Sequence, residues 1–379
     1  MTEPVRKKKT AILQTCRRLH RHRISIGFCA ALAAVLAGTF AVVDRSTAEP
    51  KPDPRGLGVR EISVTATPIP TFDRTDSSRH KFGKLTFLGG LRLSSPEKSF
   101  GGWSGLAIDP DGRGLIAVSD AGLWMTARLG HEDGRPATFG DVRTGPLKAL
   151  SGSPLGRERD RDAEAVELVA GTSNNGKLLI AFEQNHRIGR FDIGPDGVAP
   201  PTSYIRPDRS SGTMDGLKGF EAMTLLTKGR YRDSVIAIAE RLHDSNGDHT
   251  GWFWTGSTAN AFTLTDIDGY DITGMAELPG GDLVLLERRF NWLEGVKMRL
   301  RRVALAELKP GAKIEGEVLL EATMAQDIDN MEGLAIHQDH AGSAILTLIS
   351  DDNFNQLFQR TILLQFKMQA GEGEQAVVR

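Results

Sequence analysis

The chain has 379 residues, of which 40% are hydrophobic and 25% are charged. This is the composition of an ordinary globular protein, and it excludes a collagen-like, disordered or multi-span membrane protein. The formal net charge of −1 is unevenly distributed: residues 1–48 hold nine Lys or Arg and two Asp or Glu, so residues 49–379 carry a net charge of −8. Because an acidic body repels phosphate backbones, we expect no nucleic-acid partner.

Residues 1–48 have the order of an export signal. A basic segment precedes the uncharged residues 24–43, and the small residues Ser46-Thr47-Ala48 follow. This order predicts a cleaved signal peptide and a periplasmic or secreted protein. The alternative is an uncleaved inner-membrane anchor facing the periplasm, since 20 apolar residues can span a bilayer, and only then is membrane contact expected. Both cysteines, Cys16 and Cys29, lie in this leader, which excludes disulfides and thiolate sites from the exported part.

The segment that follows, residues 49–80, holds five prolines and scattered charges, which favours an extended linker. Residues 369–379 are expected to form a flexible tail. Between these segments, short β-rich runs alternate with Gly, Asp, Asn and Pro, and helical periodicity is absent. The predicted strands are 84–88, 115–119, 178–183, 234–240, 282–287, 344–350 and 361–366.

Five segments begin alike, with a polar residue followed by a small one and an apolar one. The polar residues, spaced by 60, 57, 52 and 59, are Ser104, Glu164, Glu221, Thr273 and Glu332. Repeats of about 40–50 residues with four strands, plus loops, are typical of propeller blades. The sequence predicts an all-β fold, a monomeric β-propeller over residues 81–368 with five blades, or six if one blade is degenerate. The early strand 84–88 would complete the last blade.

In a propeller these five repeat positions meet around one channel. Further carboxylates would lie nearby, at the end of the second strand of each unit: Asp120, Glu183, Glu240, Glu287 and Asp351. Crowded carboxylates require raised pKa values or a cation, and oxygen ligands suit calcium. The cluster therefore predicts calcium held by Glu164, Glu221 and Glu332. The alternative is that these carboxylates accept backbone hydrogen bonds or pair with Arg to fix neighbouring blades.

Six short motifs occur in a fixed order: GGWSGL at 101–106, VSDAGLW at 118–124, DAE at 162–164, FEQN at 182–185, NMEGL at 330–334 and SDDNF at 350–354. Together they resemble the phytase-like domain of exported bacterial proteins, a family labelled esterase-like activity of phytase. The resemblance covers residues 81–368 and implies a propeller. Through more distant kinship with β-propeller phytases, it also implies calcium-assisted phosphoester hydrolysis. The phosphate-binding pattern of those phytases has no residue-by-residue match, so the resemblance assigns no catalytic residue.

Other motifs suggest different chemistry. A serine esterase needs a G-x-S-x-G turn, which Gly102-Trp103-Ser104-Gly105 approaches without completing, so Ser104 is interpreted as a channel hydroxyl. Residues 244–248 begin like a calcium loop but lack its glycine and final glutamate, which favours a surface hairpin. The histidines show no metal-ligand spacing, and His186 is the one expected to face the channel.

A basic stretch near residue 300 allows two interpretations. Arg299 and Arg301 lie on one strand face, and with Arg288 they could hold substrate phosphates. The alternative is a solvated outer strand.

The leading hypothesis is an exported, calcium-assisted phosphoesterase that acts on a small-molecule ester at the channel mouth. Catalytic candidates are Glu183, Glu240 and Asp351, and substrate-binding candidates are Ser104, Asp120, His186, Arg288, Arg299 and Arg301. The alternatives are a non-catalytic binding module and a calcium-dependent hydrolase of carboxyl esters or lactones.

Overall fold

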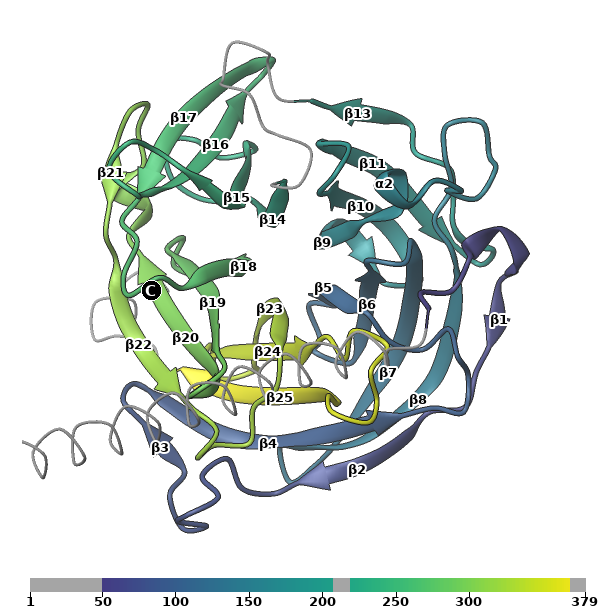
Figure 1. Cartoon of the computed structure of the whole chain (residues 1–379), viewed down its shortest axis with the longest axis horizontal. Helices are drawn as coiled ribbons and strands as arrows, with labels where there is room; N and C mark the ends of the chain where they lie inside the picture. The colour runs from purple at the N-terminus through teal and green to yellow at the C-terminus, as the bar shows by residue number, and fades with distance from the viewer. Residues whose placement is uncertain (1–49, 207–218, 369–379) are drawn as a thin grey trace, which may run out of the picture. The chain divides into compact units, whose positions relative to one another are not determined.

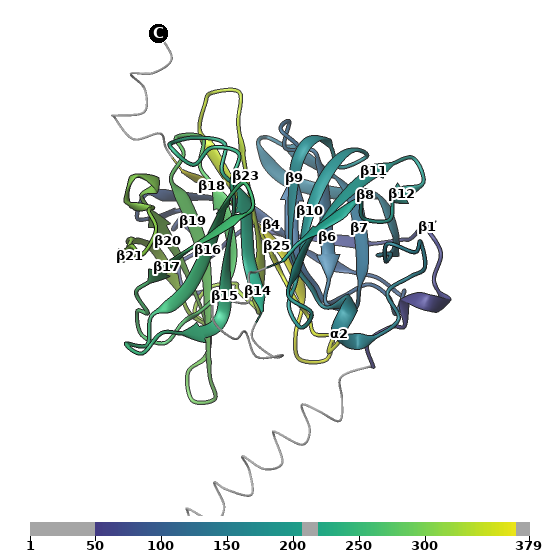
Figure 2. The same cartoon turned by 90° about the horizontal axis from the view of Figure 1, so that it is seen from above.

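Five sheets, antiparallel except for one parallel strand pair between β17 and β21, make up the computed structural model, which describes residues 50–206 and 219–368. Figure 1 shows them as blades around one axis, so the fold is the predicted five-bladed β-propeller. The innermost strand of each blade contacts that of the next, and the fifth contacts the first, which closes the ring. In Figure 2 the neighbouring sheets lie face to face.

The blades are described from the axis outwards. Blade 1 contains β5 (Trp103–Ile108), β6 (Gly114–Ser119), β7 (Leu123–Glu132), β8 (Arg135–Pro146) and β1 (Arg60–Glu61). Blade 2 contains β9 (Ala163–Thr172), β10 (Asn175–Phe182) and β11 (Arg187–Gly194), which pairs with both β12 (Gly197–Val198) and β13 (Ser203–Ile205). Blade 3 contains β14 (Phe220–Leu225), β15 (Val235–His243), β16 (His249–Thr255), β17 (Thr258–Leu264) and β21 (Lys313–Ile314).

The last two blades follow the same order. Blade 4 contains β18 (Asp271–Glu277), β19 (Leu283–Asn291), β20 (Gly295–Val303) and β22 (Glu317–Ala322). Blade 5 contains β23 (Met331–Gln338), β24 (Ala344–Ser350), β25 (Thr361–Met368), β4 (Leu85–Ser94), β2 (Thr65–Ile69) and β3 (Lys81–Phe82), which pairs with β4. The described helical segments are short: η1 (Pro54–Gly56), α2 (Glu158–Arg161) and η3 (Leu305–Glu307). None of the helices in the described part is long and apolar enough to cross a membrane.

An early strand closes the ring. β4 pairs with β25 from Thr361–Leu93 to Met368–Leu85, and Figure 1 shows the two strands side by side although they come from opposite ends of the chain. This confirms that blade 5 takes its fourth strand from the start of the propeller. The arrangement pairs the edge that a three-stranded last blade would leave open.

The segment predicted to be a linker contributes outer strands instead. β1 pairs with β8, and β2 pairs with β4, so part of residues 49–80 belongs to the edges of blades 1 and 5. Pro68 lies in β2, where an outermost strand tolerates the missing N–H group. The predicted export signal at 1–48 and the tail at 369–379 lie outside the described residues.

The core is divided among the gaps between the blades. Five clusters of buried apolar side chains each join two neighbouring blades, as in the cluster that packs Leu91 and Leu363 of blade 5 against Leu106 and Leu115 of blade 1. The middle strands β6 and β24 are buried along their whole length because both of their faces are covered. This packing holds the inner strands, and the polar side chains on them, in fixed positions.

Candidate functional site: an acidic channel

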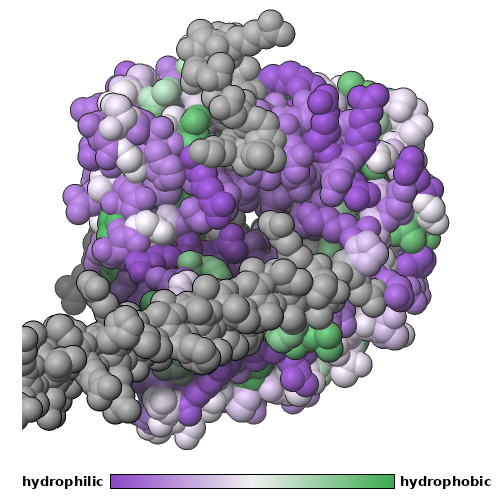
Figure 3. Space-filling view, viewed as in Figure 1, coloured by the Kyte–Doolittle hydropathy of each residue, from purple (hydrophilic) through white to green (hydrophobic). Residues whose placement is uncertain are grey.

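All five inner strands carry a β-bulge at the same place. In each, one residue is skipped in the register with the second strand, which is the mark of a bulge. The skipped residues are the five repeat positions, Ser104, Glu164, Glu221, Thr273 and Glu332. A bulge re-aims the side chain of its extra residue, and all five residues line the central channel. Figure 3 shows hydrophilic residues around the hollow at the centre of the ring.

A second set of side chains lies where the second strand of each blade ends its pairing with the inner strand. In each blade, the inner-strand residue just before the bulge pairs with a residue of the second strand, and the residue meant is the one directly after that partner. In four blades this residue is acidic: Asp120, Glu183, Glu240 and Asp351. Their backbone N–H groups donate to the carbonyls of Gly102, Asp162, Gly219 and Asn330, at 3.1, 2.9, 3.2 and 2.9 Å respectively. These bonds fix the carboxylates at equivalent places around the mouth of the channel.

Blade 4 differs from the other four. In this blade Glu287 is still paired within the sheet, with Ile272 as its partner. The position equivalent to the four acidic residues is therefore that of Arg288, opposite Asp271. The prediction that Glu287 belongs to the acidic set was therefore wrong by one residue. The five equivalent positions thus carry four carboxylates and one guanidinium.

Two groups of three carboxylates come close enough to share a cation. One oxygen each from Asp162, Glu164 and Glu183 lie within 4.8 Å of one another, and so do oxygens of Glu183, Glu221 and Glu240. Glu183 belongs to both groups, and all five residues come from blades 2 and 3. Oxygen ligands at this spacing suit a hard divalent cation such as calcium.

Glu332, predicted as a third calcium ligand, belongs to neither group. It lies 3.7 Å from the guanidinium of Arg288 and accepts a hydrogen bond of 2.8 Å from the side-chain amide of Asn330. Arg288 also donates to the oxygen of Asn330 and lies 3.6 Å from Glu240. This side of the channel therefore supplies its own positive charge.

The carboxylates of blades 2 and 3 have less compensation: of the five grouped residues, only Glu240 has an ion-pair partner in the described chain, with Arg241 at 3.4 Å and Arg288 at 3.6 Å. Burial raises the pKa of Glu164 well above its ordinary value, and the charge of Glu221 raises it further. Burial, followed by the charges of Glu240 and Glu183, does the same for the pKa of Glu221. The pKa of Glu183 rises to about 8 because of burial and of its neighbour Asp162. Among the described residues, Glu164 and Glu221 have no hydrogen-bond or ion-pair partner. The cluster is short of positive charge.

A lysine from the N-terminal segment also reaches the mouth. The ammonium group of Lys51 lies 2.7 Å from the carboxylate of Asp120. Burial opposes its charge, but the attraction of Asp120, with smaller contributions from Asp162 and Glu164, raises the pKa of Lys51. Lys51 precedes the first strand, and no motif or repeat predicted this contact.

One acidic residue at the mouth has a structural role. A carboxylate oxygen of Asp352 accepts hydrogen bonds from the N–H groups of Gly102 and Phe354, both at 3.1 Å, which ties blade 5 to blade 1. Gly102 has a φ of +67°, and a Cβ there would lie 2.5 Å from an oxygen of Asp120. The structural alternative therefore holds for Asp352.

Two arginines predicted to bind substrate lie outside the channel lining. Arg299 is 2% exposed, pairs with Asp268 at 2.9 Å and lies over the ring of Tyr270. Arg301 is fully buried, pairs with Glu287, and donates to the carbonyls of Thr265 at 2.7 Å and Glu315 at 2.9 Å. The prediction that they face the mouth was wrong, and so was the alternative of a solvated strand. Both arginines instead connect blade 4 to the loop that follows blade 3.

Two further residues predicted to bind substrate are Ser104 and His186. Ser104 lines the channel, and its hydroxyl donates to the carbonyl of Gly102 at 3.4 Å. His186 lies in the turn after Glu183, and within the described chain its buried ring nitrogens have no hydrogen-bond partner.

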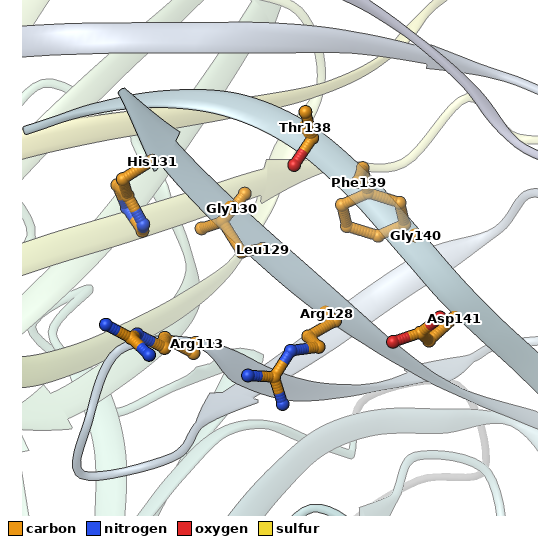
Figure 4. Close-up of a pocket in the computed structure, with 9 residues that line it drawn as sticks. All are labelled: Arg113, Arg128, Leu129, Gly130, His131, Thr138, Phe139, Gly140 and Asp141. Carbon is orange, nitrogen blue, oxygen red and sulfur yellow. The ribbon is translucent and has the colours of Figure 1, made fainter. Parts of the chain in front are cut away.

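A second depression lies on the outer part of blade 1 (Figure 4). It is lined by β7 and β8, with Arg113 from the loop before β6. Its charged side chains include Arg113, Arg128 and Asp141, and it shares no residue with the channel lining. The predicted cation chemistry belongs to the channel and not to this surface.

Comparison with known proteins gives one informative match. A family model described as "Phytase-like: Esterase-like activity of phytase" matches residues 98–354. None of the curated proteins compared with the chain matches it. Among solved structures, the β-propeller domain of Cps50 (Swd1) from Myceliophteria thermophila is similar, with 11% identity and a TM-score of 0.36 over 83% of this chain and 100% of that one. At that similarity the match carries no argument, and the fold assignment rests on the sheet topology.

Proposed function

Because the chain belongs to the phytase-like family, described as having esterase-like activity, we propose that this hydrolase-like propeller hydrolyses phosphoesters at its channel mouth with the help of calcium. The observation that carries the proposal is the deficit of positive charge around Glu164, Glu183 and Glu221. Such a cluster is poised to take up a divalent cation.

The ligands of that cation would come from blades 2 and 3. Asp162, Glu164, Glu183, Glu221 and Glu240 offer oxygens at suitable mutual distances, which fits calcium. A bound calcium ion would supply Lewis-acid polarisation of a phosphoryl oxygen and would offset the acidic field that otherwise repels an anionic substrate.

Arg288 is the residue best suited to orient the substrate. Its guanidinium lies 3.6 Å from Glu240, a member of the second carboxylate group, and 3.7 Å from Glu332, so it stands beside the proposed cation ligands. A guanidinium can donate two parallel hydrogen bonds to a phosphate, and this geometry would hold the phosphoryl group in one orientation.

Glu183 is the best candidate for proton transfer. With a pKa of about 8 it would exist in both protonation states near neutral pH, so it could accept a proton from the attacking water or donate one to the leaving oxygen. Cation binding would lower the pKa of Glu183, so Glu183 would be a weaker base while it served as a ligand. Glu240, at the edge of the second group, and Asp351 are the other candidates.

Within the described part of the chain, the mouth lacks the parts of a serine esterase, which disfavours hydrolysis of carboxyl esters through a serine nucleophile. The hydroxyl of Ser104 donates to a backbone carbonyl, and no histidine is among the residues that line the channel. We propose that the protein acts as an exported monomer on a small molecule, in line with the leader and with the acidic body.

The test is hydrolysis of p-nitrophenyl phosphate and p-nitrophenyl butyrate by the purified protein, with calcium and with EGTA. We expect calcium-dependent phosphatase activity that Arg288→Gln reduces. Calcium-dependent turnover of only the butyrate ester would establish the carboxyl-ester hydrolase instead. Folded, calcium-loaded protein that turns over neither substrate would indicate a binding module.

A further inference from the structure

A second group of possible metal ligands lies at the outer end of blade 3. His243 ends β15 and His249 begins β16, and the hairpin register makes them direct partners across the turn. Their rings are 4.7 Å apart between centroids. The turn is shaped by Asp244, which accepts the N–H groups of Asn246 at 2.8 Å and Asp248 at 3.0 Å. The predicted surface hairpin therefore brings together two histidines that are six positions apart in the chain.

Asp266 completes the group from the loop after β17. Its Oδ2 lies 3.9 Å from the Nε2 of His243 and 3.9 Å from the Nε2 of His249. The ligand atoms of all three residues lie within 4.8 Å of one another. In a tetrahedral zinc site with bonds of about 2.0–2.1 Å, ligand atoms are about 3.4 Å apart, so each of the two Asp266 distances would have to shorten by about half an ångström to complete the site.

The burial of His249 points to a ligand. This side chain is 1% exposed, and neither of its ring nitrogens has a partner in hydrogen-bond geometry within the described chain. Burial and then His243 lower the pKa of His249, against the attraction of Asp266. The backbone of Glu240 lies near this ring but does not meet hydrogen-bond geometry. A neutral imidazole with an unpaired nitrogen is the form that binds a metal.

The remaining groups at the site support the same function. The other oxygen of Asp266 accepts the N–H of Gly269 at 2.7 Å, which orients the carboxylate as an outer hydrogen bond does in metal sites. The nearby charge of Arg301 is balanced by its ion pair with Glu287. None of the three residues lines the central channel.

We propose that His243, His249 and Asp266 bind a divalent transition metal, with zinc the best fit. Two imidazoles and one carboxylate select a metal of this class over calcium, which prefers oxygen ligands. His243 and Asp266 are 33% and 28% exposed, so the metal can enter from solvent, and a water molecule would take the fourth position. The ion would connect the β15–β16 hairpin to the loop that leads into blade 4.

The test is titration of the untagged, EDTA-treated full chain with Co²⁺, whose tetrahedral complexes absorb visible light, followed by displacement with Zn²⁺. We expect one equivalent of tetrahedral Co²⁺ that Zn²⁺ displaces and Ca²⁺ does not. His243→Gln and Asp266→Asn each remove a direct ligand and should each weaken binding at least about 100-fold. Removing only an outer hydrogen-bond partner of a ligand weakens metal binding by about 10- to 100-fold, and the loss of a ligand should reach or exceed the upper end of that range. His340→Gln, at an exposed histidine, is the matched control and should bind like the wild type.

The channel variant Glu221→Gln separates this site from the proposed calcium site, and it should retain the Co²⁺ equivalent. The proposal is overturned if the wild type binds no stoichiometric Co²⁺, if His243→Gln binds as tightly as the wild type, or if Glu221→Gln abolishes the signal.

Discussion

Glu221 lies between Glu183 and Glu240 without an ion-pair or hydrogen-bond partner in the described chain, and the more distant charge of Arg288 offsets its environment only in part. Its place in the channel follows from the bulge in β14, which re-aims one side chain without disturbing the strand pairs on either side.

Glu221→Gln should weaken calcium binding by at least about tenfold, because the variant keeps the shape of the side chain but loses one ligand charge. Isothermal titration calorimetry with calcium measures the effect. Glu132→Gln, at the exposed end of β7, is the control and should bind like the wild type. Equal affinity of Glu221→Gln and the wild type would remove Glu221 from the ligand set.

Lys51 competes with any cation for the same acidic field through its contact with Asp120. Lys51→Ala should therefore strengthen calcium binding by about tenfold, the effect of removing one nearby positive charge at intermediate effective dielectric constant. The effect should shrink as salt is added. Lys81→Ala, an exposed lysine on β3, serves as the control. Unchanged or weaker calcium binding in Lys51→Ala would contradict this role.

Some of these residues could be predicted from the sequence and others could not. Glu164, Glu221 and Glu332 were identified because they recur at the same point of a repeat, and the repeat does bring them to one channel. Glu287 was placed in the acidic set in error, because only the strand register shows that it pairs inside the sheet and that Arg288 takes the equivalent position. Lys51 precedes the repeat, so no periodic signal could place it.

At the scale of the element, the ion pair between Glu287 of β19 and Arg301 of β20 is almost completely buried. A buried charge left without its partner is costly, whereas replacing both partners with uncharged groups is often close to neutral.

Arg301→Met should lower the free energy of unfolding by about 3 kcal/mol, because it leaves the buried Glu287 carboxylate with only the more distant guanidinium of Arg299, at 3.9 Å. The double variant with Glu287→Gln should recover much of that loss. Urea unfolding of the wild type, both single variants and the double variant gives the coupling energy. A double variant as unstable as the sum of the single variants would show that the pair is not coupled.

The elements themselves were predicted to different degrees. The closing strand β4 could be foreseen because the last unit lacked one strand. β1 and β2 could not, since they are short, and proline-rich sequence is more often a linker than a sheet edge. His243 and His249 showed no metal-ligand spacing because their proximity depends on the hairpin register, which a list of positions does not contain.

At the scale of the whole molecule, several channel carboxylates have folded-state pKa values above their unfolded values, that of Glu183 at about 8. Between the unfolded and folded pKa values, the folded state holds protons that the unfolded state has released. Stability therefore falls as pH rises through this window.

In EGTA, the free energy of unfolding should decrease from pH 5 to pH 8, by about 1.4 kcal/mol per pH unit for each extra proton held by the folded state. Calcium should flatten or reverse this slope, because a bound cation stabilises the ionised carboxylates. Urea unfolding across this pH range, with and without calcium, measures both slopes. A stability that rises with pH in EGTA, or slopes that calcium leaves unchanged, would contradict the unpaired acidic cluster.

The most direct measurement is anomalous diffraction from crystals of the protein grown with calcium. The account predicts an anomalous peak among the carboxylate oxygens of Glu183 and its neighbours in blades 2 and 3. Well-ordered acidic side chains with no peak in the channel, at a calcium concentration that supports any activity, would contradict it.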